Sequence, residues 1–286
     1  MRFGRSLVSS LAVLTALGLT ACGGESTPAT PQAAVVQAAD KTSDAGSSRA
    51  FFEITMTGIG PQPLTMTGEG IFDSSERKGR MTMDLSALAE GSGQDLGEAE
   101  MIFDEFVVYM KFPFLQELQP GLKPWLKFDI RELGKEQGFD LGQLSQLNQN
   151  DPSQALQYLR AASDDVSEVG KEEVRGVETT HYRMTIDLQK VVEQAPEDQR
   201  EQLRASIDQI IEQSGVRMVP TEVWVDDDGL ARRMKLTYEG MRFAPGQQGD
   251  MTMTMELYDF GVDVDVEPPP DSEVTDIQEL LNQRKA

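Results

Sequence analysis

Cysteine and histidine are nearly absent from this 286-residue sequence, which contains one of each. One cysteine cannot form an intrachain disulfide, and with one histidine it cannot supply the ligands of a zinc site. Walker, dinucleotide-binding and Gly-x-Ser-x-Gly motifs are also missing, so the common phosphate cradles and serine nucleophiles are not predicted. We therefore predict a protein that is not an enzyme, with no catalytic residue, no metal ligand and no cofactor.

The two remaining candidates for chemistry have simpler structural interpretations. His181 lies just before an alternating segment and has no second histidine near it, so a structural role is favoured over catalysis. Asp226, Asp227 and Asp228 precede Gly229, whereas an EF-type calcium loop places its ligands at alternate positions. The acidic run therefore predicts a hairpin turn.

Basic residues are scarce, with 26 Lys and Arg against 48 Asp and Glu, a formal net charge of −22. Binding to nucleic acid depends on neutralising phosphates with basic side chains, and adhesion to anionic headgroups has the same requirement. The composition therefore argues against a nucleic-acid partner and against membrane attachment by surface charge.

Long apolar runs are missing except at the N-terminus. Two basic residues precede the apolar run Leu7–Leu19, which ends in Leu19-Thr20-Ala21-Cys22. This is the layout of a secretory signal, and the run is too short to cross a bilayer core of about 30 Å as a helix. We expect residues 1–21 to be a signal peptide, followed by a lipid-modified Cys22 on the extracytoplasmic face of the cell membrane.

The segment after Cys22 has few large apolar residues. Residues 23–48 are rich in Ala, Ser, Thr, Pro and Gln, a composition that buries too little surface to offset the entropy of ordering. We therefore predict a disordered tether over residues 22–48 and one folded domain over residues 49–286.

From about Arg49 the pattern becomes period-two alternation of apolar and polar residues, typical of β-strands in an antiparallel meander. Pro268-Pro269-Pro270 is expected to end the sheet. Apolar stripes at helical spacing occur in the middle of the chain, in segments near Asp151–Leu159, Leu188–Ala195 and Leu203–Ile211, the last including Ile210. The fold class predicted is α+β, a curved antiparallel half-barrel sheet of about ten strands with amphipathic helices on its concave face.

Methionine is unusually frequent, with 14 residues, and most lie at alternating strand positions. Because methionine is flexible and polarizable, a face lined with it suits apolar partners of variable shape, although an ordinary core facing the helices is the alternative. The candidate lipid-pocket residues are Phe52, Ile54, Met56, Leu64, Met66, Met81, Met83, Met101, Phe103, Met234, Leu236, Tyr238, Met251, Met253 and Met255.

Several local segments resemble one family. They are Trp125–Asp129, Val169–Val177 followed by His181-Tyr182, Val223–Asp226 and Tyr258–Gly261. Together with the lipobox-like Leu19–Cys22 they are similar to the LolA-like superfamily, especially actinobacterial LppX/LprG-type lipoproteins. The resemblance covers about residues 49–270 and implies a half-barrel with an apolar cavity for lipid, in proteins that move or present lipids and lipoglycans in the cell envelope.

Three functions stay open from the sequence. The first is a carrier of a lipid or lipoglycan ligand, with a lid between Pro113 and Ala162 or over Pro196–Ser214 and with an envelope transporter or acceptor protein as partner. The second is a non-enzymatic envelope sensor or interaction module with a filled core. An enzyme comes third, because no nucleophile and base constellation is evident.

Overall fold

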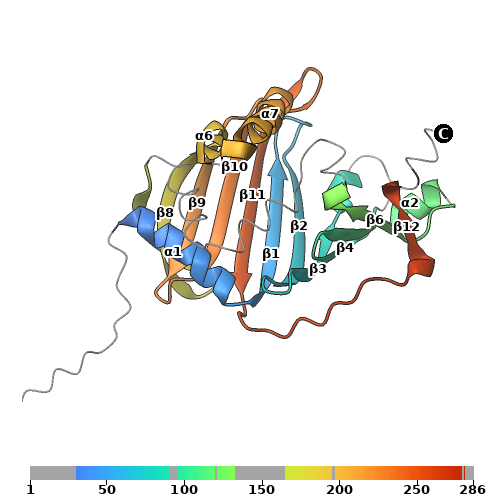
Figure 1. Cartoon of the computed structure of the whole chain (residues 1–286), viewed down its shortest axis with the longest axis horizontal. Helices are drawn as coiled ribbons and strands as arrows, with labels where there is room; N and C mark the ends of the chain where they lie inside the picture. Colours follow the sequence, from blue (N-terminus) through green and yellow to red (C-terminus); the bar gives the residue numbers. More distant parts are fainter. Residues whose placement is uncertain are drawn as a thin grey trace, which may run out of the picture.

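The alternating segments form strands of a single sheet (Figure 1). In this computed structural model the described residues are 30–89, 96–119, 121–132, 165–194, 197–278 and 280. The first half of the chain provides β1 (Ser47–Met56), β2 (Leu64–Asp73), β3 (Lys78–Asp84), β4 (Glu98–Asp104), β5 (Val107–Lys111) and β6 (Trp125–Asp129). The second half provides β7 (Ser167–Val174), β8 (Val177–Asp187), β9 (Met218–Asp226), β10 (Ala231–Ala244), β11 (Gln247–Tyr258) and β12 (Val274–Asp276).

Two antiparallel meanders meet at the centre of this sheet. Its strand order is β12-β6-β5-β4-β3-β2-β1-β11-β10-β9-β8-β7, so the first strand of the chain pairs with the last long one. Arg49 lies opposite Tyr258 at one end of this pairing and Met56 lies opposite Met251 at the other. The predicted fold class is confirmed as a curved, open, mainly antiparallel sheet.

The sheet has twelve strands where about ten were expected. The prediction that Pro268-Pro269-Pro270 ends the sheet was wrong, because β11 already ends at Tyr258 and the chain after the prolines returns to the far edge, where β12 pairs with β6 in parallel. Three residues are too few to show a period, so the sequence pattern could not reveal this strand.

The N-terminal segment differs from the prediction, because α1 (Pro31–Asp44) is a helix within the expected tether. Thr30 caps it by accepting a hydrogen bond from the backbone N–H of Ala33 at 3.1 Å, and Pro31 occupies its first turn. Its buried stripe consists of Ala34, Val35, Val36 and Ala38. These side chains are small, so a search for large apolar residues missed them.

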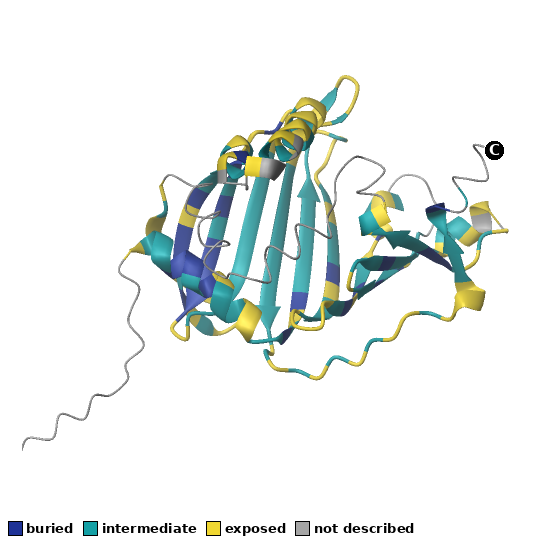
Figure 2. Cartoon of the chain, viewed as in Figure 1, coloured by how far each residue is buried: buried dark blue, intermediate teal, exposed yellow. Residues whose placement is uncertain are grey.

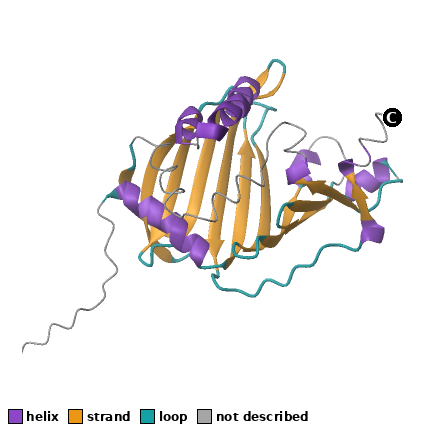
Figure 3. Ribbon diagram, viewed as in Figure 1, coloured by secondary structure: helices purple, strands orange, loops and turns teal. Residues whose placement is uncertain are grey.

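The remaining helices are short except one. They are η1 (Ser86–Ala89), α2 (Pro113–Leu118), α6 (Leu188–Gln194), α7 (Glu197–Ser214) and η2 (Asp271–Glu273), and Figure 3 shows how they lie around the sheet. The predicted helices near Leu188 and Leu203 are confirmed as α6 and α7, whereas the one predicted near Asp151 lies outside the described residues. Ile210 was expected to pack inward but is 50% exposed, whereas Leu203, Ile207 and Ile211 of the same stripe are half-buried. α7 lies at the ends of the strands (Figure 1).

An ion pair closes the base of the α6–α7 insertion between β8 and β9. Asp187 accepts two hydrogen bonds from Arg217, at 3.0 and 2.7 Å, and a third from the backbone N–H of Gln189 at 3.0 Å. These bonds, led by that of Arg217, hold the pKa of Asp187 below its ordinary value although its burial opposes this. The insertion therefore leaves and rejoins the sheet at one fixed point.

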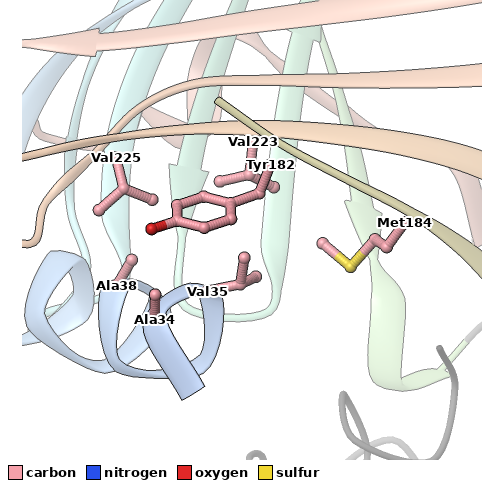
Figure 4. Close-up of a cluster of buried hydrophobic side chains, with 7 residues drawn as sticks. All are labelled: Ala34, Val35, Ala38, Tyr182, Met184, Val223 and Val225. Atoms are coloured by element: carbon pink, nitrogen blue, oxygen red, sulfur yellow. The ribbon is translucent and has the colours of Figure 1, made fainter. Parts of the chain in front are cut away.

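Buried residues gather on α1, β8 and β9, where the helix packs on the sheet (Figure 2). In Figure 4 the side chains of α1 point at those of β8 and β9. The cluster consists of Ala34, Val35, Ala38, Tyr182, Met184, Val223 and Val225. The backbone N–H of Ala231 also donates to the Thr42 hydroxyl at 2.8 Å, and Lys41 donates to the Asp228 carbonyl at 3.0 Å. α1 is thus an integral part of the domain.

A charge inside this contact tests whether α1 belongs to the domain. Ala38 is 1% exposed, so Ala38→Glu places an unpaired carboxylate between helix and sheet. We expect the free energy of unfolding to fall by about 2–4 kcal/mol and amide protection to be lost across residues 31–44. Gln37→Glu adds the same charge at a half-buried neighbour and should leave protection intact; equal protection in both variants would contradict α1 docking.

Candidate functional site

The strand register places all fifteen candidate pocket residues on one face of the sheet. Residues directly opposite each other in paired strands share a face. One row across four strands is Leu236, Met253, Ile54 and Met66. The row on one side of it is Tyr238, Met251, Met56 and Leu64. The row on the other side is Met234, Met255, Phe52, Gly68 and Met83. Farther along the sheet, Met81 pairs with Met101, and Phe103 lies opposite Gly79. We call these fifteen residues the methionine face.

The methionine face is only partly covered. Met81 is buried, whereas the other fourteen members are half-buried. A long apolar face that remains half-buried is unusual, since side chains in a protein core generally lose nearly all contact with water. The face therefore has room for further apolar contact.

A cavity of about 220 Å³ lies between α1 and this face. Val35, Ala39 and Thr42 form its helical wall, and Ala39 is exposed, so the cavity opens beside α1. The sheet contributes Met184, Ile186, Thr221, Val223, Ala231, Arg233, Met234, Leu236, Met255 and Leu257. Because most of this lining is hydrocarbon or thioether, the cavity matches an apolar chain.

The structure thus brings three predicted residues, Met234, Leu236 and Met255, into the cavity, and leaves the other twelve beside it on the same face. Sequence reasoning missed the α1 wall. It also left out Met184, Ile186 and Leu257, although each alternates with polar neighbours in its strand. Cys22 lies outside the described residues.

Aromatic rings form the far part of the same face. The Phe72 ring lies 5.8 Å from that of Phe52 and 5.7 Å from that of Phe103. Gly70 and Gly79 provide the space beneath the Phe72 ring, because a Cβ atom on either would collide with it. The glycines therefore let three aromatic side chains lie in contact across β1, β2 and β4.

The opposite face of the sheet is polar and crossed by ion pairs. Glu256 accepts hydrogen bonds from Arg233 at 2.6 and 2.9 Å and from Arg175 at 2.7 Å. The Arg175 guanidinium also lies 4.2 Å from the centre of the Tyr258 ring. Burial alone would raise the pKa of Glu256, but the two arginines hold it below its ordinary value.

His181 belongs to this polar face, away from the methionine face. Its ring stacks on that of Trp224 with centroids 4.2 Å apart. Its Nδ1 lies 3.2 Å from Glu172 and its Nε2 lies 2.8 Å from Glu222. A hydrogen bond from the Trp224 indole N–H is the main cause that lowers the pKa of Glu172. The histidine is 3% exposed, as the structural interpretation expects.

The turn predicted at Asp226–Gly229 is confirmed. Asp226 accepts from the backbone N–H of Leu230 at 2.8 Å and from Arg232 at 2.6 Å, and Gly229 has a φ of 80°. Within the described ranges no group of three or more His, Cys, Asp or Glu side chains is arranged to hold a metal ion. None of the described helices combines the length and hydropathy needed to cross a bilayer.

No protein-family model matches the chain. Two Streptomyces proteins are each 28% identical to it. One is an uncharacterized 31.2 kDa protein of Streptomyces griseus from the rplA–rplJ intergenic region, matched over 265 residues, 89% of this chain and 82% of that protein. The other is a Streptomyces coelicolor protein provisionally named a lipoprotein, matched over 187 residues, 64% of this chain and 52% of that protein.

Among solved structures, Mycobacterium tuberculosis lipoprotein LppX matches 83% of this chain and 98% of its own, with a TM-score of 0.47 and 14% identity. LprF from Mycobacterium bovis matches 84% of this chain and 96% of its own, with a TM-score of 0.45 and 13% identity. The chain is similar to LppX and LprF. These are proteins of the type that the sequence motifs indicated.

The ion pairs of the polar face predict a pH-dependent stability. In Glu256→Gln the two arginines lose their shared carboxylate, so we expect the free energy of unfolding at pH 7 to fall by about 2–4 kcal/mol. Because the folded-state pKa of Glu256 is lowered, its contribution is complete above the unfolded pKa and is lost as the pH falls through the folded one.

Denaturant unfolding of the parent chain and of Glu256→Gln between pH 7 and pH 3 measures this dependence. The free energies of unfolding of the two proteins should become equal in acid. Glu53→Gln is the control, since Glu53 lies on the same face and faces Thr67 and Thr254 across the strands. A loss of unfolding free energy in Glu256→Gln that does not change with pH would contradict the role assigned to Glu256. An equal loss in Glu53→Gln would contradict it as well.

Proposed function

We propose that this chain is an extracytoplasmic lipoprotein, anchored through an acylated Cys22, that binds acyl chains of a lipid or lipoglycan on its methionine face. The observation that carries the proposal is the apolar cavity of about 220 Å³ between α1 and that face. The name of the Streptomyces coelicolor relative agrees with the anchor.

The energetics favour a hydrocarbon ligand. Shielding an acyl chain from water is worth about 25 cal/mol per Å² of buried apolar surface. The cavity is smaller than a typical ligand site of roughly 300–1,000 Å³, so it would hold part of a chain, with the remainder along the half-buried methionine face. Methionine side chains adapt their shape to such a chain, which suits lipids of different length.

In this proposal the protein is not an enzyme, and it carries or presents its ligand to a transporter or acceptor protein of the envelope. The acylated Cys22 and the cavity have separate roles, because the acylated cysteine keeps the protein at the membrane and the cavity holds the lipid ligand. A sensor or interaction module with a filled core is the competing function, and it requires no bound lipid.

Native mass spectrometry tests the proposal on the mature chain carrying Cys22→Ala, followed by organic extraction of whatever co-purifies. We expect a stoichiometric lipid. Met255→Glu places a carboxylate in the cavity and should reduce lipid occupancy at least about tenfold, because an unpaired charge there costs several kcal/mol.

Thr252→Glu is the matched control, since it adds the same charge to the same strand on the polar face, opposite Thr55 and Thr237. Its occupancy should equal that of the parent. A chain that is isolated without lipid and takes none from vesicles would instead support the module with a filled core.

A further inference from the structure

Exposed apolar side chains gather at the end of the strands where α7 lies. Ile210 on α7 is 50% exposed and Met218 at the start of β9 is 47% exposed. Ala244 and Pro245, at the tip of the β10–β11 turn, are exposed as well, and Figure 1 shows this turn projecting past α7. We call these four residues the α7 edge.

The same end of the sheet carries two more such side chains. Leu88 follows β3 and Leu118 follows β5, and they are 45% and 65% exposed. Of the large exposed apolar residues in the described part of the chain, Ile130 and Val169 lie elsewhere, Ile130 at the opposite strand end beside the β4–β5 turn. Leu88 and Leu118 lie several strands from α7 in the sheet order, so the α7 edge is the local group, and exposed apolar side chains gathered in this way indicate a contact surface.

A cation lies beside the β10–β11 turn of this edge. An open hollow of about 830 Å³ between α7 and the β10–β11 turn is lined by Gln213, Arg242 and Phe243, among others. Arg242 lies against Gly215, where an added Cβ atom would be 2.9 Å from its Nε. Within the described residues Arg242 has no carboxylate partner, unlike Arg217 and Arg233. A free guanidinium in a hollow suits a phosphate group.

The length of chain before α1 indicates what the partner is. Cys22 and Thr30 are eight residues apart, so they are separated by at most about 30 Å even when that chain is fully extended. An acylated Cys22 therefore holds the domain next to its own bilayer. The anchor gives that bilayer a high effective concentration at the protein surface, so weak contacts suffice.

We propose that the α7 edge docks on the phospholipid bilayer that holds the anchor, with its apolar side chains among the acyl chains and Arg242 at a headgroup phosphate. The proposal rests on the acylation of Cys22 in the proposed function and adds the surface at which ligand is exchanged. The row Tyr238, Met251, Met56 and Leu64 is the part of the methionine face nearest this end. An acyl chain leaving the bilayer there would meet the face directly.

The test uses the acylated full-length mature chain in phosphatidylcholine vesicles. Because acylation occupies the native thiol, an environment-sensitive fluorophore attaches only at an introduced cysteine, in Met218→Cys, Pro245→Cys or the control Ile130→Cys. We expect nitroxide-labelled lipids to quench the first two and to leave the third unquenched. In a double variant, the label at Pro245→Cys reports docking while Ile210→Ser removes the isoleucine side chain. The docking equilibrium should weaken about tenfold, because a fully buried isoleucine contributes at least about 1.5 kcal/mol.

Arg242→Gln separates the phosphate contact from the apolar one. It should weaken docking on phosphatidylcholine and leave docking unchanged on galactolipid vesicles, which lack phosphate. An equal effect on both overturns the phosphate assignment.

Equal quenching at all three labelled positions, or quenching at none, overturns the docking proposal. Burial of the labels only after envelope proteins are added overturns it as well and assigns the edge to a protein partner. The mass of the N-terminal peptide and the lipid content of the purified chain report acylation and cargo separately, so failure of the proposed function is distinguishable from failure of docking.

Discussion

The alternation of side chains along paired strands is the constraint on which the rest of this structure depends. A slip of one residue in any pairing would exchange the methionine face for the charged face in that strand. Glu256 opposes such a slip, because it bridges Arg233 on the neighbouring strand and Arg175 in the β7–β8 turn. The polar contacts on one face thereby keep the apolar residues together on the other.

A single open sheet with one apolar face must cover that face. α1 covers it at β8–β10, and α6 and α7 lie at the strand ends. The remainder stays half-buried, including the central row of Leu236, Met253 and Ile54. An incomplete cover is a defect in a protein that only needs a core, but it is a requirement in one that takes up hydrocarbon. In the proposed lipoprotein, only eight positions separate Cys22 from Thr30 at the start of the same helix, so the anchor would lie close to the cavity wall.

The period of two was sufficient to predict the methionine face from the sequence. Met251, Met253 and Met255 occupy alternate positions of one strand, so they are predicted to share a face whatever the strand order is. Antiparallel pairing extends that face across the neighbouring strands. The pairing of β1 with β11 joins residues about 200 positions apart, and nothing local specifies it. The cavity depended on α1, whose contact is made by Ala34, Val35 and Ala38, so the helix lacks the stripe of large apolar residues by which helices are usually found.

Methionine methyl NMR with an acyl-chain ligand tests the central claim, that the methionine face binds hydrocarbon, most directly. With ¹³C-labelled methionine and a soluble lysolipid, we expect large, saturable chemical-shift changes for Met234 and Met255 in the cavity and for Met253 beside it, with each signal assigned by substitution of its own residue. Unchanged methionine signals with the lysolipid in excess would contradict hydrocarbon binding and identify the methionine face as an ordinary core.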